Sequence, residues 1–210
     1  MPSPVGHILG ATIVYAASSK AISLPKLSKW HYLGLALLAL LPDIDAALLS
    51  HAPHRGVTHG LLGAAVISFL FYLLLRSAGA ADAPRSRFVV CSVLCAVAHP
   101  IMDTLGCPAH PVEWFAPFWY FDLSIDPYWT ILPQPYFYIV YGNSFYLPLS
   151  AIVDNIPQII CEVMVLSGVL VFLTLPRSRI HSRFVRYVPI VVACLSWIVW
   201  RLYFPTVWMR

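Results

Sequence analysis

Charged residues are scarce in this sequence: 10% of its 210 residues are Asp, Glu, Lys or Arg, whereas 60% are hydrophobic. A soluble domain has about a quarter charged residues, and one core of this size cannot bury so much apolar surface. The composition therefore argues against a soluble protein and predicts that lipid covers the remaining apolar side chains. We expect residues 1–210 to form a single integral membrane domain.

Several motifs are also missing. The five cysteines show no zinc-binding pattern and indicate no disulfide framework. Cys91 and Cys95, four residues apart in an apolar stretch, are expected to be small buried side chains. The absence of a His-Glu-x-x-His motif disfavours a protease of the thermolysin type. No basic segment precedes the first apolar stretch, so we expect a retained helix rather than a cleaved signal peptide.

Six apolar segments are present, and none shows the alternation typical of a half-buried strand. They cover Val5–Ser18, Trp30–Leu49, Gly60–Leu75, Phe88–Leu105, Tyr146–Leu175 and Tyr187–Phe204. A helix needs about 20 residues to cross a bilayer, so the first segment is short and the fifth is long. The pattern predicts an all-α polytopic membrane helix bundle with about six transmembrane helices, and residues 146–205 supply the last two.

The stretch between the fourth and fifth segments, Pro108–Phe145, is rich in proline and aromatic residues. Aromatic rings favour the membrane–water interface, so this stretch is predicted to be an outer loop at that depth. Two interpretations stay open. The loop either only packs at the interface or forms a lid over a site, to which Glu113, Asp122 and Asp126 would contribute.

Basic residues are concentrated in the loops after the first, third and fifth segments, which lie on one side of a six-helix bundle. They are Lys20, Lys26, Lys29, Arg76, Arg85, Arg87, Arg177, Arg179, Arg183 and Arg186. The positive-inside rule predicts that this side is cytoplasmic. Both termini would then lie on the non-cytoplasmic side.

Histidines and aspartates gather at the predicted outer ends of the first four helices. The candidate metal ligands are His7, Asp43, Asp45, His54, His59, His99 and Asp103. A charge at membrane depth is costly, so such residues are retained where they pair, line water or bind an ion. His99 and Asp103 are four residues apart and share one face of a helix. Histidine with carboxylate suits zinc, one to three ions, and also manganese or iron.

The candidate ligands also have structural explanations. His7 could be a polar helix start, Asp43 and Asp45 could terminate a helix, and His99 could simply form a hydrogen bond with Asp103.

Asp154 and Glu162, eight residues apart in the fifth segment, are expected to make a structural polar contact. They also keep a rival function open, the transport of a metal ion or proton through the same His/Asp cluster. A transporter needs polar residues toward the inner face, and the inner halves of the second, third, fourth and sixth segments are almost purely apolar. A third possibility is a structural membrane subunit with one stabilising metal ion.

Four motifs, in this order, resemble those of the LexA-regulated family of membrane-bound metal-dependent hydrolases. They are His7, Pro42–Asp43–Ile44–Asp45, His54–Arg55–Gly56–Val57–Thr58–His59 and His99–Pro100–Ile101–Met102–Asp103. The resemblance covers residues 1–130 and implies a metal-dependent hydrolase-like core there. Gly60 stands where the family often has serine.

A more distant similarity concerns the zinc-dependent phospholipase C and single-strand nuclease superfamily, whose members are helical enzymes that hydrolyse phosphoesters with clustered zinc ions. This similarity implies that Asp45, His59, His99 and Asp103 hold zinc and that His7 serves another ion.

These observations together predict a metal-dependent hydrolase, most simply a phosphoester hydrolase, that acts through metal-activated water at the non-cytoplasmic face. Arg55 is expected to stabilise charge on a phosphoryl oxygen, and Glu113 or Asp126 to act as general base or further ligand. The interfacial position of the site favours an amphiphilic, phosphate-containing substrate such as a phospholipid or an isoprenoid phosphate. The expected partner is the lipid bilayer, and no nucleic acid is expected.

Overall fold

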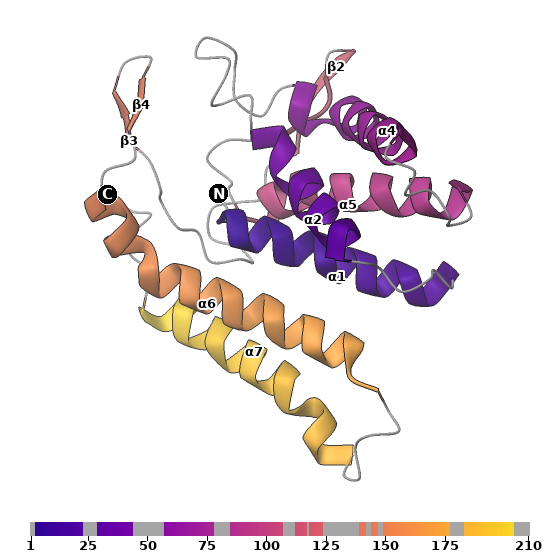
Figure 1. The fold of residues 1–210 in the computed structure, drawn as a ribbon. Helices are drawn as coiled ribbons and strands as arrows, with labels where there is room; N and C mark the ends of the chain where they lie inside the picture. Colours follow the sequence, from indigo (N-terminus) through magenta and orange to yellow (C-terminus); the bar gives the residue numbers. More distant parts are fainter. Residues whose placement is uncertain are drawn as a thin grey trace.

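The computed structural model describes residues 3–22, 29–43, 57–77, 85–106, 112–116, 118–123, 139–141, 144–146, 149–176 and 183–203. Helices dominate this part of the chain, as predicted (Figure 1). The α-helices are α1 (Pro4–Ile22), α2 (Lys29–Leu40), α4 (Leu61–Ser77), α5 (Arg85–Gly106), α6 (Leu149–Thr174) and α7 (Arg183–Tyr203). Two single-turn 3₁₀ helices are η1 (Leu41–Asp43) and η2 (Val57–His59).

One stretch of α7, Val185–Leu202, is long and apolar enough to cross a membrane by length and composition, among the residues described. The helices α2, α4, α5 and α6 contain shorter apolar stretches of 10–17 residues. The helical character of the chain is therefore confirmed. A bundle of six membrane crossings stays a prediction.

The second predicted helix is shorter than expected. The sequence predicts that it reaches Leu49, whereas α2 ends at Leu40 and passes into η1; residues 44–49 lie outside the described part of the chain. Pro42 lies in this 3₁₀ turn, and a proline lacks the amide hydrogen that would continue the α-helical ladder. The end of the helix therefore falls just before Asp43.

The aromatic stretch Pro108–Phe145 contains two antiparallel hairpins that the sequence pattern did not predict. One pairs β1 (Val112–Phe115) with β2 (Trp119–Leu123), and the other pairs β3 (Ile139–Tyr141) with β4 (Ser144–Tyr146). Aromatic and β-branched side chains favour extended backbone, which offers a physical reason for strands here. The predicted outer loop thus contains β-strands, and α6 begins at Leu149 rather than at Tyr146.

Helix α1 lies at the centre of the fold and packs against α2, α5 and α6 (Figure 1). One core cluster joins α1 to α2, α4 and α5, and its buried members are Ala11, Tyr15, Leu35, Leu38, Ala39, Phe71, Cys91 and Cys95. The prediction that Cys91 and Cys95 are small buried side chains is confirmed. On the other side of α1, the helices α6 and α7 form a pair that contacts the rest through α6.

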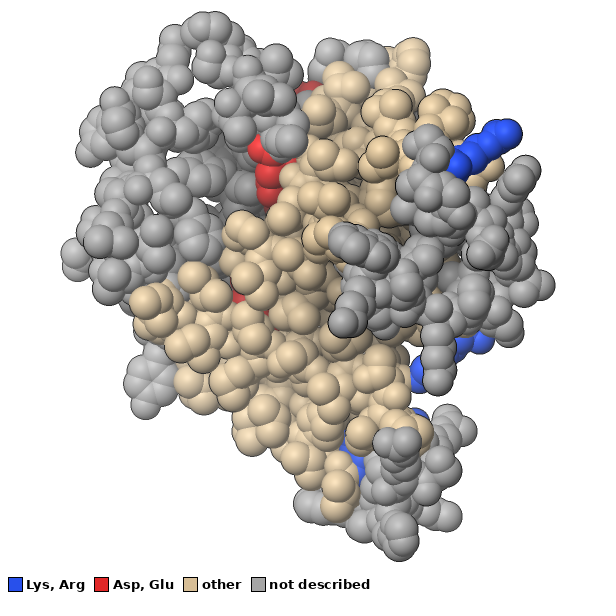
Figure 2. Space-filling model, viewed as in Figure 1, with Lys and Arg blue, Asp and Glu red and all other residues tan. Residues whose placement is uncertain are grey.

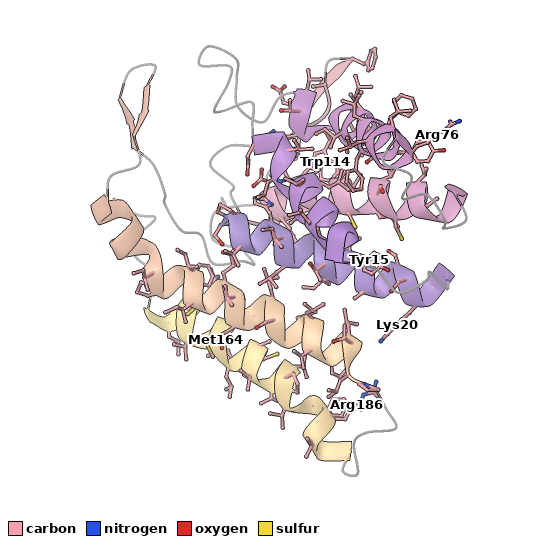
Figure 3. The ribbon with its side chains drawn as sticks, in the orientation of Figure 1. Tyr15, Lys20, Arg76, Trp114, Met164 and Arg186 are labelled. Atoms are coloured by element: carbon pink, nitrogen blue, oxygen red, sulfur yellow. The ribbon has the colours of Figure 1, made fainter. Side chains whose placement is uncertain are left out.

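Several basic residues lie at one end of the described helices, although Arg201, in the last turn of α7, lies at the opposite end of that helix from Arg186. Lys20, Arg76 and Arg186 are labelled toward one end of the helical array in Figure 3. In the space-filling view the Lys and Arg atoms lie on one side and the Asp and Glu atoms toward the other (Figure 2). The loops that contain most of the predicted basic residues lie outside the described part of the chain, so their separation from the His/Asp end stays a prediction. Which end faces the cytoplasm stays a prediction.

Candidate metal centre

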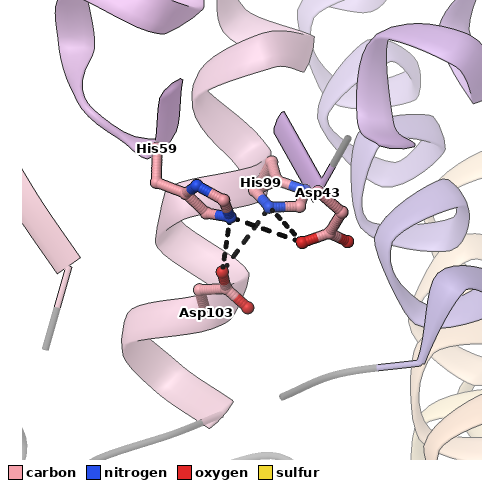
Figure 4. Close-up of side chains that lie close together, drawn as sticks. All are labelled: Asp43, His59, His99 and Asp103. Atoms are coloured by element: carbon pink, nitrogen blue, oxygen red, sulfur yellow. Dashed lines mark hydrogen bonds and ion pairs between the residues drawn. The ribbon is translucent and has the colours of Figure 1, made fainter. Parts of the chain in front are cut away.

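Four side chains from three separate elements lie close together (Figure 4). Asp43 ends η1, His59 ends η2, and His99 and Asp103 lie one turn apart on α5. One donor atom from each of the four lies within 4.8 Å of the other three donors, an arrangement that could hold a metal ion. We call these four residues the metal-ligand cluster.

Nitrogen and oxygen donors alternate around this cluster. The Nε2 atom of His59 lies 3.3 Å from Asp43 Oδ1 and 3.5 Å from Asp103 Oδ2. The Nε2 atom of His99 lies 3.5 Å from each of the same two oxygens. Donors that bind zinc at about 2.0–2.2 Å in a tetrahedral site are about 3.3–3.6 Å apart. The four nitrogen–oxygen distances lie in this range, whereas the full set of four donors is spread over as much as 4.8 Å, wider than a regular tetrahedron around zinc.

Local sequence explains how His59 reaches the cluster. It ends a single 3₁₀ turn, and Gly60 connects that turn to α4. A side chain at Gly60 would place its Cβ 2.9 Å from the carbonyl oxygen of Glu113 and 3.0 Å from that of Trp114. The backbone of β1 therefore packs directly on Gly60, which gives a physical reason for glycine where the resembling family often has serine.

The two histidines of the cluster are oriented through their other ring nitrogen. His99 Nδ1 lies 2.7 Å from the backbone carbonyl oxygen of Ala39, to which it donates a hydrogen bond. That bond fixes the tautomer and leaves Nε2 with a lone pair directed at the cluster. His59 Nδ1 lies 3.1 Å from Thr58 Oγ. Histidines that bind metals almost always have such a partner, because it sets the ring orientation.

Burial and charge also fit a metal ion. The side chains of His59, His99 and Asp103 are fully buried, and Asp43 is 21% exposed. Two buried carboxylates need positive charge nearby, because isolated charges are strongly disfavoured in a low-dielectric interior. One divalent cation with neutral histidines would balance them. Within the described residues, the buried His99 Nε2 has no hydrogen-bond partner, which is what a ligand atom without its ion would show.

His7 lies at the edge of the metal-ligand cluster. It is buried in the first turn of α1, and its Nε2 is 3.5 Å from Asp103 Oδ1. Its ring stacks on His99 with a centroid distance of 4.0 Å and an interplanar angle of 16°. In the described part of the chain, neither nitrogen of His7 has a hydrogen-bond partner. His7 therefore faces the Asp103 oxygen opposite to the one shared by His59 and His99.

Other candidates are not in the cluster or cannot be placed. Glu113 is half-buried on β1, opposite Asp122 in the hairpin register, and does not belong to the cluster. The predicted ligands Asp45 and His54 and the predicted catalytic residues Arg55 and Asp126 lie outside the described residues. Of the pair in the Pro-Asp-x-Asp motif, the structure thus places Asp43 in the cluster.

Two hydrogen bonds, from His99 and to Glu162, differ in how far the sequence predicts them. The hydrogen bond from His99 to the Ala39 carbonyl is not predictable, because any residue type has a backbone carbonyl. Thr58, by contrast, stands next to His59 in the His-Arg-Gly-x-Thr-His motif.

The expected polar contact of Glu162 is present: its carboxylate accepts a hydrogen bond from the backbone amide of Ser3. The side chain of Asp154 lies outside the described part of the chain.

Comparison with known proteins matches most of the chain to one family. Residues 1–203 match the sequence model of the YdjM inner membrane protein family. Neither a curated protein nor a solved structure matches the chain significantly. The matched range includes α6 and α7, beyond the residues 1–130 that carry the motifs. The family description gives a membrane location and no reaction, so the likeness to metal-dependent hydrolases stays a prediction. The chain belongs to the YdjM inner membrane protein family.

Proposed function

We propose that this protein is a multi-pass, membrane-embedded metal-dependent hydrolase that cleaves a phosphoester of a lipid or another amphiphilic substrate at the non-cytoplasmic membrane face. The observation that carries the proposal is the metal-ligand cluster, in which two histidines and two aspartates from three elements bring their donors within 4.8 Å. The buried His99 Nε2 lies 3.5 Å from both carboxylates without a hydrogen bond of good geometry, a placement that suits a shared metal ligand.

The donor set favours zinc over harder ions. Two imidazole nitrogens and two carboxylate oxygens suit zinc, and also manganese or iron. Asp43, His59, His99 and Asp103 would hold the ion, and His7 would serve the outer oxygen of Asp103. A divalent ion held there would supply Lewis-acid activation of water and of a phosphoryl oxygen.

The protein's own side chains would perform the remaining tasks. Asp43 is the most exposed member of the cluster, so a substrate would approach past its carboxylate. Arg55, four residues before His59, would bind a phosphoryl oxygen through its planar guanidinium. Glu113 lies on β1, which packs against η2, and would serve as a general base together with Asp126 or in its place.

The surroundings of the cluster favour an amphiphilic substrate. Phe115 and Phe118, on the β1–β2 hairpin beside η2, are 46% and 83% exposed. Exposed aromatic rings are common at the membrane–water interface, where a lipid headgroup would meet the site. A phospholipid or isoprenoid phosphate has both the apolar tail and the phosphate that this arrangement would bind.

The proposal can be tested on the full chain purified in detergent. Bound metal is measured by elemental analysis, and phosphodiester and phosphomonoester lipids are assayed with the wild type and with Asp103→Asn. We expect about one to three ions per chain, hydrolysis by the wild type, and loss of both in the variant. Well-folded wild-type protein without bound metal would refute the proposal.

The same experiment separates the rival functions. Metal binding without hydrolysis, but with uptake of the ion into liposomes, would indicate a transporter. Metal binding with neither hydrolysis nor uptake would indicate a structural metal ion. The predicted orientation is tested separately by labelling single cysteines introduced at positions 55 and 180, and position 55 should react from the non-cytoplasmic side.

A further inference from the structure

Glu162 is a fully buried carboxylate on α6 that no part of the proposed chemistry uses. Both of its oxygens lie 3.1 Å from the backbone nitrogen of Ser3, immediately before α1. The two residues are 159 positions apart in the sequence. A buried carboxylate at a helix start is stabilised there by the unpaired amide groups and by the helix dipole.

Ser3 is the N-cap of α1 and links Glu162 to His7. Its Oγ accepts a hydrogen bond from the Gly6 amide at 3.0 Å, and its carbonyl accepts one from the His7 amide at 3.0 Å. Pro4 takes the first helical position, where its missing amide hydrogen costs nothing. The Ser3 backbone is therefore held by α6 on one side and holds His7 on the other.

Gly6 provides the space that Glu162 fills. In a capping box, an acidic side chain three residues after the N-cap reaches back to the N-cap amide. That position in α1 is Gly6, and a Cβ there would overlap the carboxylate of Glu162. The carboxylate that the local sequence lacks is thus supplied by a different helix.

Two further contacts fix α6 along α1. Lys20, in the last turn of α1, donates a hydrogen bond to the carbonyl oxygen of Leu173 near the end of α6. Between these two ends, Leu166 of α6 packs in a cluster with Met102 of α5 and with Leu9 and Ile13 of α1. Helix α6 therefore contacts α1 at both ends and in the middle, and contributes to its axial register alongside α2 and α5.

The position of His7 depends on this register. Its ring lies against His99 and Asp103, yet within the described residues neither ring nitrogen makes a hydrogen bond that would hold it there. Only the backbone of α1 and side-chain packing set its place. A small displacement of the first turn would move the ring away from the metal-ligand cluster.

We propose that Glu162 is a positioning residue: by capping α1 from α6, it holds His7 against the metal-ligand cluster, so that the C-terminal helix pair completes the metal centre. This inference rests on the proposed function for the importance of the metal. It assigns α6 a role in the site although none of its described side chains belongs to the cluster.

The test measures cobalt(II) binding to the full chain in detergent. Glu162→Ala removes the carboxylate, and Gly6→Ala displaces it without changing the acid. Each should weaken cobalt binding about 10–100-fold, as loss of a residue that orients metal ligands does, and should change the cobalt absorption spectrum. Glu162→Gln keeps one acceptor oxygen and should lose less affinity. Ser167→Ala is the matched control, since Ser167 bonds only within α6 to the Met164 carbonyl in the described structure.

Amide hydrogen exchange on metal-free protein provides a second readout. The first turn of α1 should exchange faster in Glu162→Ala and Gly6→Ala than in Ser167→Ala. If these variants are folded but keep the wild-type cobalt affinity and spectrum, Glu162 has only a structural role and the inference is wrong. If Glu162→Ala does not fold, Gly6→Ala and Glu162→Gln decide by the same criterion. Wild-type protein that binds no cobalt would instead refute the proposed function, and this inference with it.

Discussion

Metal binding at the cluster should raise the unfolding temperature of the protein, and Asp103→Asn should remove that increase. Asp103 is fully buried, and its two oxygens face three histidines, His7 on one side and His59 and His99 on the other. Asparagine has nearly the same shape, so the substitution leaves packing intact. It removes one of the two negative charges that would balance a divalent cation, and one of the four ligands.

The size of the effect follows from linkage. A ligand that binds only the folded state at a hundredfold excess over its Kd stabilises that state by about 2.7 kcal/mol. For a chain of this length, each kcal/mol shifts the unfolding temperature by roughly 2–4 °C. Zinc at that concentration should therefore raise the wild-type value by roughly 5–11 °C. The same zinc should move the value for Asp103→Asn by less than about 2 °C.

The assay is thermal unfolding in detergent, with each protein measured in zinc and in chelator. The quantity compared is the zinc-induced shift, because Asp103→Asn also breaks ion pairs in the metal-free protein and lowers its stability directly. Ser167→Ala again serves as a control and should keep the full shift. A wild-type protein without a zinc-induced shift, or an Asp103→Asn variant that retains it, would show that the cluster is not a metal site.

Two further substitutions test how the cluster is positioned. Thr58→Val removes the hydroxyl beside His59 Nδ1 while it preserves the shape of the side chain; zinc affinity in competition with a chelator should fall about 10–100-fold, and an unchanged affinity would mean that this contact does not orient His59. Gly60→Ser forces a Cβ to within 3.0 Å of two β1 carbonyl oxygens. It should lower the free energy of unfolding by about 1–3 kcal/mol, as measured with denaturant, and a neutral result would show that β1 moves away easily.

Residues within one helix or one short motif were predictable from the sequence. The spacing of four places His99 and Asp103 on one face of α5, and both are in the cluster. The His-Arg-Gly-x-Thr-His motif predicts His59 as a ligand, and His59 is in the cluster. The sequence comparison favours Asp45 ahead of Asp43 as a ligand; the structure places Asp43 in the cluster, and Asp45 lies outside the described residues. Pro42 ends that helix early, and the resulting 3₁₀ turn directs Asp43 to His59 and His99.

Contacts between distant segments were not predictable from periodicity. The sequence marked Glu162 as an unusual acid in an apolar helix, but nothing local to it indicates Ser3 as its partner. The two hairpins in the aromatic stretch are not evident from its sequence, because its prolines and aromatic rings are also typical of interfacial loops. Strand pairing in such short segments depends on a partner strand, which a single segment does not reveal.

The long separation between Ser3 and Glu162 sets the order in which the metal centre can mature during synthesis. Ribosomes add about 5–20 residues per second, so the 159 residues between the two take roughly 10–30 s. Every member of the metal-ligand cluster is present once Asp103 has been added, and Glu162, whose carboxylate caps α1, follows 59 residues later, after roughly 3–12 s at that rate. Once α6 is in place, Glu162 caps the first turn of α1. The addition of α6 is therefore the last step needed before His7 is held beside the cluster.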